Sequence, residues 1–75
     1  QSRLTVFEMV MLGLGRRLSW RVTPDIFERV DQTLHAMQIS HLADRPVASL
    51  SGGQKQLVFM AQAFVSRPRV LLRST

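Results

Sequence analysis

The sequence contains no cysteine, only two histidines and only five acidic residues among 75. Without cysteine the chain has neither a disulfide nor a thiolate metal site, which fits a reducing compartment. His35 and His41 are accompanied by no cluster of carboxylates, so no metal site is expected and both are predicted to lie on the surface. No Ser/His/Asp arrangement and no carboxylate pair is placed for covalent or acid–base chemistry, so no catalytic residue is predicted.

Long hydrophobic runs are also absent. A membrane-spanning helix needs about 20 consecutive apolar residues, and the apolar stretch 6–14 is short and is interrupted by Glu8. This stretch also lacks the small-residue cleavage pattern of a secretory signal. The length allows one small domain, which buries only about 60% of the surface of its unfolded chain. Because apolar residues 70–72 follow Pro68 like a strand without a sheet, we expect a piece of a longer protein.

Ten basic residues against five acidic ones give a net charge of +5. This balance fits either a solvated surface or an anionic partner. Two Arg-rich patches lack the interleaved aromatic residues of a single-strand binder: Arg16, Arg17, Arg21 and Arg67, Arg69, Arg73. A small basic module that binds nucleic acid is therefore kept as an alternative, although a basic recognition helix is missing. A folded remnant without function is the other alternative.

Three helices are predicted, each from a capping signal that precedes apolar residues at helical spacing. Their expected ranges are 5–14, 23–38 and 51–66. The capping signals are a Thr5–Glu8 capping box, the Thr23-Pro24 start and a Ser51–Gln54 capping box. Gly13 and Gly15 are expected to end the first helix, and Pro68 stops the third.

The expected fold class is therefore all-α, with three main helices around a small core. That core is predicted from residues of the second and third helices: Phe27, Val30, Leu34, Phe59 and Phe64. Apolar residues of the first helix are expected to join it: Val6, Met9, Val10 and Leu14. Residues 16–22 are predicted as a loop with Trp20 as a packing anchor, 39–43 as a short turn, and 47–50 as extended backbone.

The most informative segment is Leu50-Ser51-Gly52-Gly53-Gln54, at the entrance of the third predicted helix. The first N–H groups of a helix have no partner inside it, and the helix dipole adds partial positive charge there, so this end suits a phosphate. The two glycines allow an anion to approach the backbone closely. The plainer alternative is that Ser51 and Gln54 only cap the helix.

Extended to Gln56, this segment resembles the signature motif of ATP-binding-cassette (ABC) ATPases. Flanking segments strengthen the resemblance: Leu4–Glu8, Gly15-Arg16, Ala43–Pro46, Ala61-Gln62-Ala63, and 67–72 as the approach to a Walker B strand. Residues 1–75 are thereby interpreted as the helical subdomain of a P-loop α/β ABC ATPase, incomplete at both ends and with a truncated C-terminal strand. The subfamily that the chain most resembles comprises importers of iron-siderophores, haem and cobalamin. This similarity lies in residues 18–22 and in the third-helix segments Gln56-Leu57-Val58 and Ala61-Gln62-Ala63.

The resemblance implies one part of an ATP-binding subunit that drives import of an iron chelate. In this family two subunits pair head to tail and enclose each ATP between the Walker A loop of one and the signature motif of the other. Ser51 would then bind the γ-phosphate, Gly52 and Gly53 would present amides, and Gln54 would cap the helix and approach the nucleotide. The implied partners are a second ATPase subunit and a membrane permease, which would dock beside 5–14 on the cytoplasmic side.

The sequence also departs from the family. No G-x-x-x-x-G-K-[ST] phosphate loop is present. Arg73, Ser74 and Thr75 stand where the family continues its apolar strand and then has an Asp for Mg²⁺ and a Glu for the attacking water. The parent subunit is therefore expected to be an Mg²⁺-dependent ATPase, whereas this piece is expected to be inactive and a poor ATP binder by itself.

Overall fold

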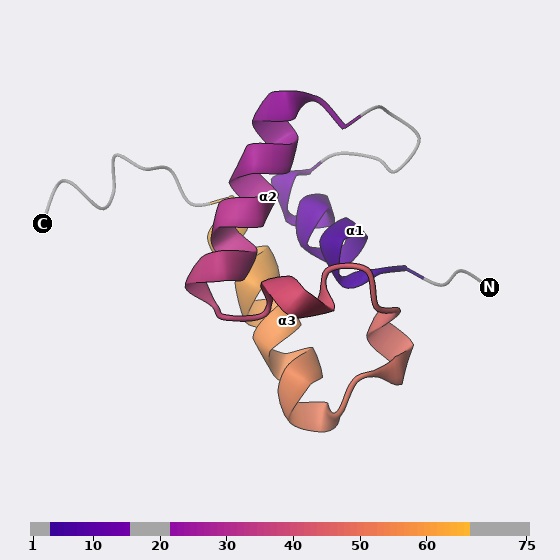
Figure 1. Ribbon diagram of the computed structural model, residues 1–75. Helices are drawn as coiled ribbons and strands as arrows, with labels where there is room; N and C mark the ends of the chain where they lie inside the picture. Colours follow the sequence, from indigo (N-terminus) through magenta and orange to yellow (C-terminus); the bar gives the residue numbers. More distant parts are fainter. Residues whose placement is uncertain (1–3, 16–21, 67–75) are drawn as a thin grey trace, which may run out of the picture.

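The computed structural model describes residues 4–15 and 22–66 (Figure 1). These residues form three α-helices, α1 (Val6–Met11), α2 (Pro24–Ala36) and α3 (Gly52–Val65), and three 3₁₀ turns, η1 (Leu12–Leu14), η2 (Ser40–Leu42) and η3 (Val47–Ser49). No strand occurs within the two described ranges, where Thr5 and Pro46 form one isolated antiparallel bridge. The expected all-α class is confirmed. The predictions for Trp20, the two Arg-rich patches and the strand at 70–72 lie outside the described residues.

The helices begin where the capping signals predict. At α1 the Glu8 N–H donates to Thr5 Oγ1 at 3.2 Å, and the Thr5 N–H donates to Glu8 Oε1 at 2.9 Å. At α2 Thr23 Oγ1 accepts from the Ile26 N–H at 3.2 Å, and proline occupies the first turn, where a missing N–H costs nothing. Each cap satisfies an N–H that the helix itself cannot pair.

The helices end by two different devices. α1 tightens into η1 and stops at Gly15, whose φ of 76° is left-handed. α2 ends in a Schellman arrangement, in which the Ile39 N–H donates to the Leu34 carbonyl at 2.9 Å and the Gln38 N–H to the His35 carbonyl at 3.0 Å. Gln38 takes the left-handed position there, with φ of 62°, where glycine is the usual residue.

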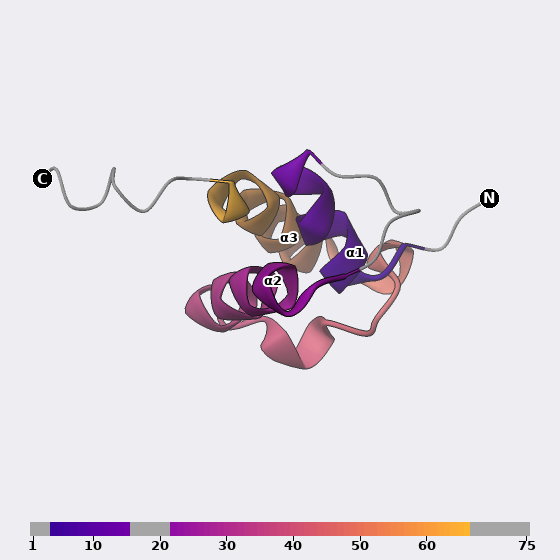
Figure 2. The ribbon, with the colours of Figure 1, turned by 90° about the horizontal axis from the view of Figure 1, so that it is seen from above.

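The three helices pack around one core, and α3 contacts both α1 and α2 (Figures 1 and 2). The buried residues come from every helix and from the turns between α2 and α3: Val6, Val10, Met11, Ile26, Val30, Leu34, Ile39, Leu42, Val47, Leu50, Val58, Ala61 and Val65. Met9 and Leu14 are partly buried against this core, so the expectation for the first helix is confirmed. Both histidines are exposed, as predicted.

The prediction for the aromatic residues is wrong. Phe27, Phe59 and Phe64 are 51%, 50% and 44% exposed, whereas Val30 and Leu34 are buried as expected. α3 is apolar on more than one side, so its periodicity does not select the inner face. The smaller residues Val58, Ala61 and Val65 take that face because the helices approach closely. Phe27 instead lies with its ring centroid 5.4 Å from that of Phe7.

The segment before Ser51 also differs from its prediction. Residues 47–49 form the 3₁₀ turn η3 rather than extended backbone, and only Leu50 is extended, at φ −86° and ψ 159°. The Ser49 N–H donates to the Pro46 carbonyl at 3.0 Å, and the Ser49 hydroxyl donates to the same oxygen at 2.8 Å. A local hydrogen bond of this kind competes with extended backbone, which explains the turn.

Candidate functional site: the N-terminus of α3

Ser51 is the N-cap of α3 and forms the predicted capping box with Gln54. The Gln54 N–H donates to Ser51 Oγ at 3.1 Å, and the Ser51 N–H donates to Gln54 Oε1 at 3.0 Å. The Ser51 carbonyl accepts from the Lys55 N–H at 2.9 Å, which opens the helical ladder. A serine hydroxyl that accepts in this way keeps its own proton, so Ser51 can still donate to a ligand.

Gly52 and Gly53 present the next two backbone N–H groups. Both residues are exposed, and within the described ranges neither N–H has a hydrogen-bond partner. The first turn of α3 contains no acidic residue, whereas α1 has Glu8 and α2 has Asp25 in that position. The positive end of the α3 dipole is therefore not compensated by a side chain, and it remains available to an anion.

Packing within the described residues does not require glycine at positions 52 and 53. A Cβ on either would meet no atom within 4 Å, and neither has a positive φ. In contrast, a Cβ on Gly13 would overlap the Gln62 carbonyl oxygen and lie 2.8 Å from Val65 Cγ1, and Gly15 needs its left-handed φ. Gly52 and Gly53 weaken the start of a helix without any internal gain, which is typical of a backbone that a ligand approaches closely.

The start of α1 holds the chain that leads to this site. The Val6 N–H donates to the Arg45 carbonyl and the Phe7 N–H to the Ala43 carbonyl, both at 3.0 Å. The Val47 N–H donates to the Leu4 carbonyl at 2.9 Å. Leu50 is 6% exposed and anchors the residue directly before Ser51 in the core. The residues that precede the site are therefore fixed by hydrogen bonds and by burial of Leu50, whereas Ser51, Gly52 and Gly53 themselves are exposed.

The four predicted site residues thus lie together at one helix end. None of their side chains is ionisable, so the arrangement can bind and orient an anion but cannot take or supply a proton. The structure shows this geometry, and the role of each residue in binding remains a prediction.

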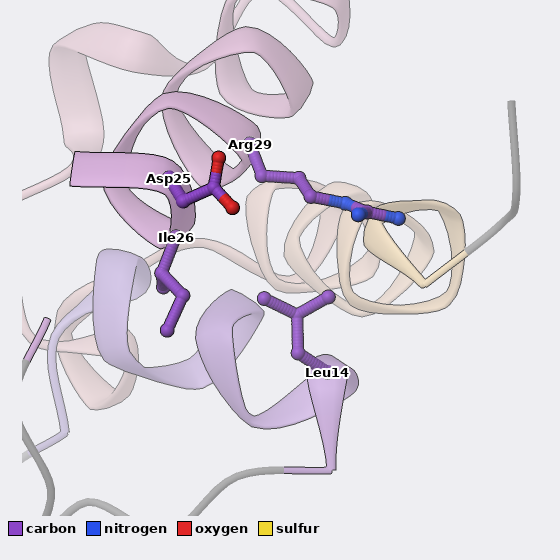
Figure 3. A pocket seen from close by; sticks show the side chains of 4 residues that line it. All are labelled: Leu14, Asp25, Ile26 and Arg29. Atoms are coloured by element: carbon purple, nitrogen blue, oxygen red, sulfur yellow. The ribbon is translucent and has the colours of Figure 1, made fainter. Parts of the chain in front are cut away.

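The other surface features of the described residues are less suited to binding a ligand. A shallow hollow is lined by Leu14, Asp25, Ile26 and Arg29 (Figure 3). In that hollow Arg29 extends across the end of α3, where its Nε–H donates to the Val65 carbonyl at 3.3 Å. The described residues contain no group of three or more His, Cys, Asp or Glu that could hold a metal ion. Among those same residues no helix has the length and apolar character needed to cross a bilayer.

The sequence is similar to those of proteins of known function. The family model described as "ABC transporter" matches residues 1–73. The spermidine/putrescine import ATP-binding protein PotA of Hahella chejuensis is 45% identical over 69 residues. The sulfate/thiosulfate import ATP-binding protein CysA of Salmonella typhi is 42% identical over 71 residues. Each alignment covers 92% of this chain, but only 18% of PotA and 20% of CysA.

A solved structure resembles the fold as well. It is described as "An inward-facing conformation of a putative metal-chelate type ABC transporter", with a TM-score of 0.77 and 30% sequence identity. The similarity covers 87% of this chain and 27% of that one. This chain therefore spans about a quarter or less of the relatives it matches. The relatives named here differ in cargo, and the iron-chelate class stays a prediction.

Proposed function

The chain belongs to the ABC transporter family, and from that premise we propose that it is part of the ATP-binding subunit of an import system. Its task is to contact the γ-phosphate of an ATP held mainly by a second subunit, through Ser51, Gly52, Gly53 and Gln54. The observation that carries this proposal is the exposed amide pair of Gly52 and Gly53, on glycines that the fold itself does not require.

The geometry suits recognition of a terminal phosphate. The Ser51 hydroxyl and the two glycine N–H groups can donate to phosphoryl oxygens, and the helix dipole adds attraction. Gln54 remains the cap that fixes Ser51. These groups stabilise charge and complete a closed state, whereas the attacking water must be activated by residues elsewhere.

Mg²⁺ does not fit this site. Magnesium in nucleotide sites is held by one or two carboxylates, hydroxyls and phosphates, and Ser51 to Gln54 include no carboxylate. In this proposal the parent ATPase holds Mg²⁺ with other residues. The 75-residue chain alone is then inactive in ATP hydrolysis and binds ATP weakly.

The partners follow from the same proposal. A second ATPase subunit supplies the rest of the ATP site, and a membrane permease docks beside α1 and η1. The protein would then work on the cytoplasmic side, attached to the membrane through the permease. For the cargo we keep the iron-chelate class that the sequence resemblance implies, with polyamine and sulfate as the classes that the named relatives carry.

The nucleic-acid alternative receives little support from the described surface. The basic residues within the described ranges are Arg29, Arg45 and Lys55, on α2, in the segment before η3 and on α3. They do not form a stripe on one helix, which a basic recognition surface would need.

The proposal is tested with the full-length parent and its permease in liposomes. ATP hydrolysis is measured together with uptake of spermidine, thiosulfate and a ferric siderophore. Ser51→Ala removes the donating hydroxyl, and Gly53→Asp places negative charge where the phosphate would lie. Removal of one such donor typically lowers a rate about 100-fold, so we expect a loss of at least tenfold in both variants.

Two exposed positions provide matched controls. Ser49→Ala removes a serine hydroxyl two residues before the site, and Gln32→Asp adds the same charge on α2. Both controls are expected to keep the parent's activity, because the backbone bond from the Ser49 N–H to the Pro46 carbonyl still holds η3 in Ser49→Ala. Normal hydrolysis and uptake by Ser51→Ala and Gly53→Asp would contradict the proposal, and would favour the plainer alternative that Ser51 and Gln54 only cap α3.

A further inference from the structure

Two side-chain hydrogen bonds connect α3 to the other helices over long stretches of sequence. Gln62 Nε2–H donates to the Met9 carbonyl of α1 at 2.8 Å, across 53 residues. Arg29 of α2, whose side chain extends toward the end of α3 in Figure 3, donates through Nε–H to the Val65 carbonyl at 3.3 Å, across 36 residues. Both bonds hold the C-terminal half of α3, which is the half remote from Ser51.

The η1 turn, which directly follows α1, also approaches α3 closely at this place. Gly13 lies directly against the Gln62 carbonyl and the Val65 side chain, with no room for a Cβ. The remaining contact surface of α3 consists of the small apolar residues Val58 and Ala61, both fully buried. Apolar contacts are non-directional, so they hold the two helices together without strongly fixing the rotation of α3 about its own axis.

Within residues 4–15 and 22–66, the N-terminal end of α3 has no comparable side-chain hydrogen bond to another helix. The polar contacts of Ser51 and Gln54 that the structure shows are those of their own capping box and helix. Upstream of this end, the Val6 and Phe7 N–H groups donate to the carbonyls of Arg45 and Ala43. Residues 43–50 fix the position of the Gly52 and Gly53 N–H groups, whereas the direction in which these groups face also changes with any rotation of α3, which the bonds at its other end oppose.

We propose that Gln62 is a positioning residue for the Ser51–Gly53 corner. By donating to the Met9 carbonyl, its amide fixes the rotation of α3 on α1 and thereby aims the phosphate-binding N–H groups. This inference rests on the proposed function of Ser51, Gly52 and Gly53. The effect of the Gln62–Met9 hydrogen bond on helix orientation can nevertheless be tested without nucleotide. The side chain does not touch the phosphate, so its role is exerted through α3.

The first experiment measures residual dipolar couplings of backbone amides in the 75-residue chain. Gln62→Met keeps the side-chain length but removes the N–H donor. Gln62→Arg restores a donor, because Arg Nε is separated from Cα by the same number of bonds as Gln Nε2. Gln32→Met makes the same chemical change at an exposed position of α2 and is the matched control.

We expect α1 and α3 of the native chain to fit one common alignment frame. In Gln62→Met the α3 couplings should require a separate frame or a changed angle between the helices, and Gln62→Arg should restore the common frame. Gln32→Met should leave it unchanged. A single unchanged frame in folded Gln62→Met would overturn the positioning role, since a merely stabilising side chain would alter the folded fraction and not the helix orientation.

The second experiment uses the assembled parent transporter and separates the two proposals. Misplacing a group by about 1 Å can cost up to 100-fold in rate, so Gln62→Met is expected to lower kcat for ATP about tenfold, with recovery in Gln62→Arg. If Ser51→Ala is inactive while Gln62→Met has full kcat, the positioning role fails and the proposed function stands. If Ser51→Ala is fully active, the proposed function itself fails.

Discussion

The glycines of the described residues show how differently one residue type can be used. Gly13 allows the backbones of η1 and α3 to meet, and Gly15 supplies a left-handed φ of 76° that ends the first helix. Gly52 and Gly53 do neither, since open space surrounds the position of each missing Cβ. A glycine that the fold does not use is evidence for a ligand.

The first prediction compares these uses. Gly13→Ala should lower the free energy of unfolding by about 1–3 kcal/mol, because overpacking forces the helices apart. Gly52→Ala should change it by less than about 1 kcal/mol and in the stabilising direction, because alanine is the better helix former. Urea unfolding of both variants measures the difference. Equal destabilisation by the two substitutions would show that Gly52 has a structural role after all.

The second prediction concerns the left-handed residue at the end of α2. Gln38 has φ of 62° within a Schellman arrangement, where a side chain costs about 1 kcal/mol relative to glycine. Gln38→Gly should therefore raise the free energy of unfolding by about 0.5–1 kcal/mol, as measured by thermal or urea unfolding. Gln32→Gly, in the middle of the same helix, should lower it by about the same amount. A loss of stability in Gln38→Gly would mean that the Gln38 side chain makes an important contact.

At the scale of the element, the helix starts could be predicted and the helix faces could not. Capping depends on residues three positions apart, such as Thr5 with Glu8 or Ser51 with Gln54, so the sequence alone reveals it. The inner face of α3 depends on what approaches it. Val58, Ala61 and Val65 are inside because Gly13 brings η1 close, a contact between residues about 50 apart that no local pattern contains.

The candidate site divides in the same way. Ser51, Gly52, Gly53 and Gln54 could be found from sequence because their arrangement is local to one helix start. The supports of α3 could not be found, because Gln62 and Arg29 act on carbonyl groups 53 and 36 residues away. The sequence signal for Gln62 is weak: it is a polar residue among the apolar residues Val58, Ala61 and Val65.

The third prediction tests which face of α3 holds the fold. Val58→Ala should cost about 2 kcal/mol of unfolding free energy, because Val58 is fully buried between the helices. Phe59→Ala should cost less than about 1 kcal/mol although it removes more atoms, because Phe59 is 50% exposed. The two variants are compared by urea unfolding. A larger loss of unfolding free energy in Phe59→Ala than in Val58→Ala would show that Phe59 belongs to the core.

At the scale of the whole molecule, apolar side chains remain on the surface. Several large ones are more than a third exposed: Val22, Phe27, Leu57, Phe59, Met60 and Phe64. Two of them, Leu57 and Met60, are three positions apart and so lie on the same side of α3, with Gly53 one turn before Leu57. A small domain with an apolar surface of this kind tends to associate.

The fourth prediction follows from that surface. Sedimentation velocity of the 75-residue chain should show association that increases with concentration. Leu57→Lys combined with Met60→Lys should shift the chain toward monomer, because both substitutions place charge on the apolar side of α3. Gln56→Lys adds charge at an exposed polar position of the same helix and should have little effect. Equal behaviour of the native chain and the double variant would assign the association to another surface.

The most direct measurement is a structure of the intact parent ATPase with ATP trapped between two subunits. The account predicts that Ser51 Oγ and the Gly53 backbone nitrogen of one subunit lie within about 3.2 Å of γ-phosphate oxygens bound by the other. A trapped complex in which this corner of α3 faces solvent, with no phosphoryl oxygen near it, would contradict the account.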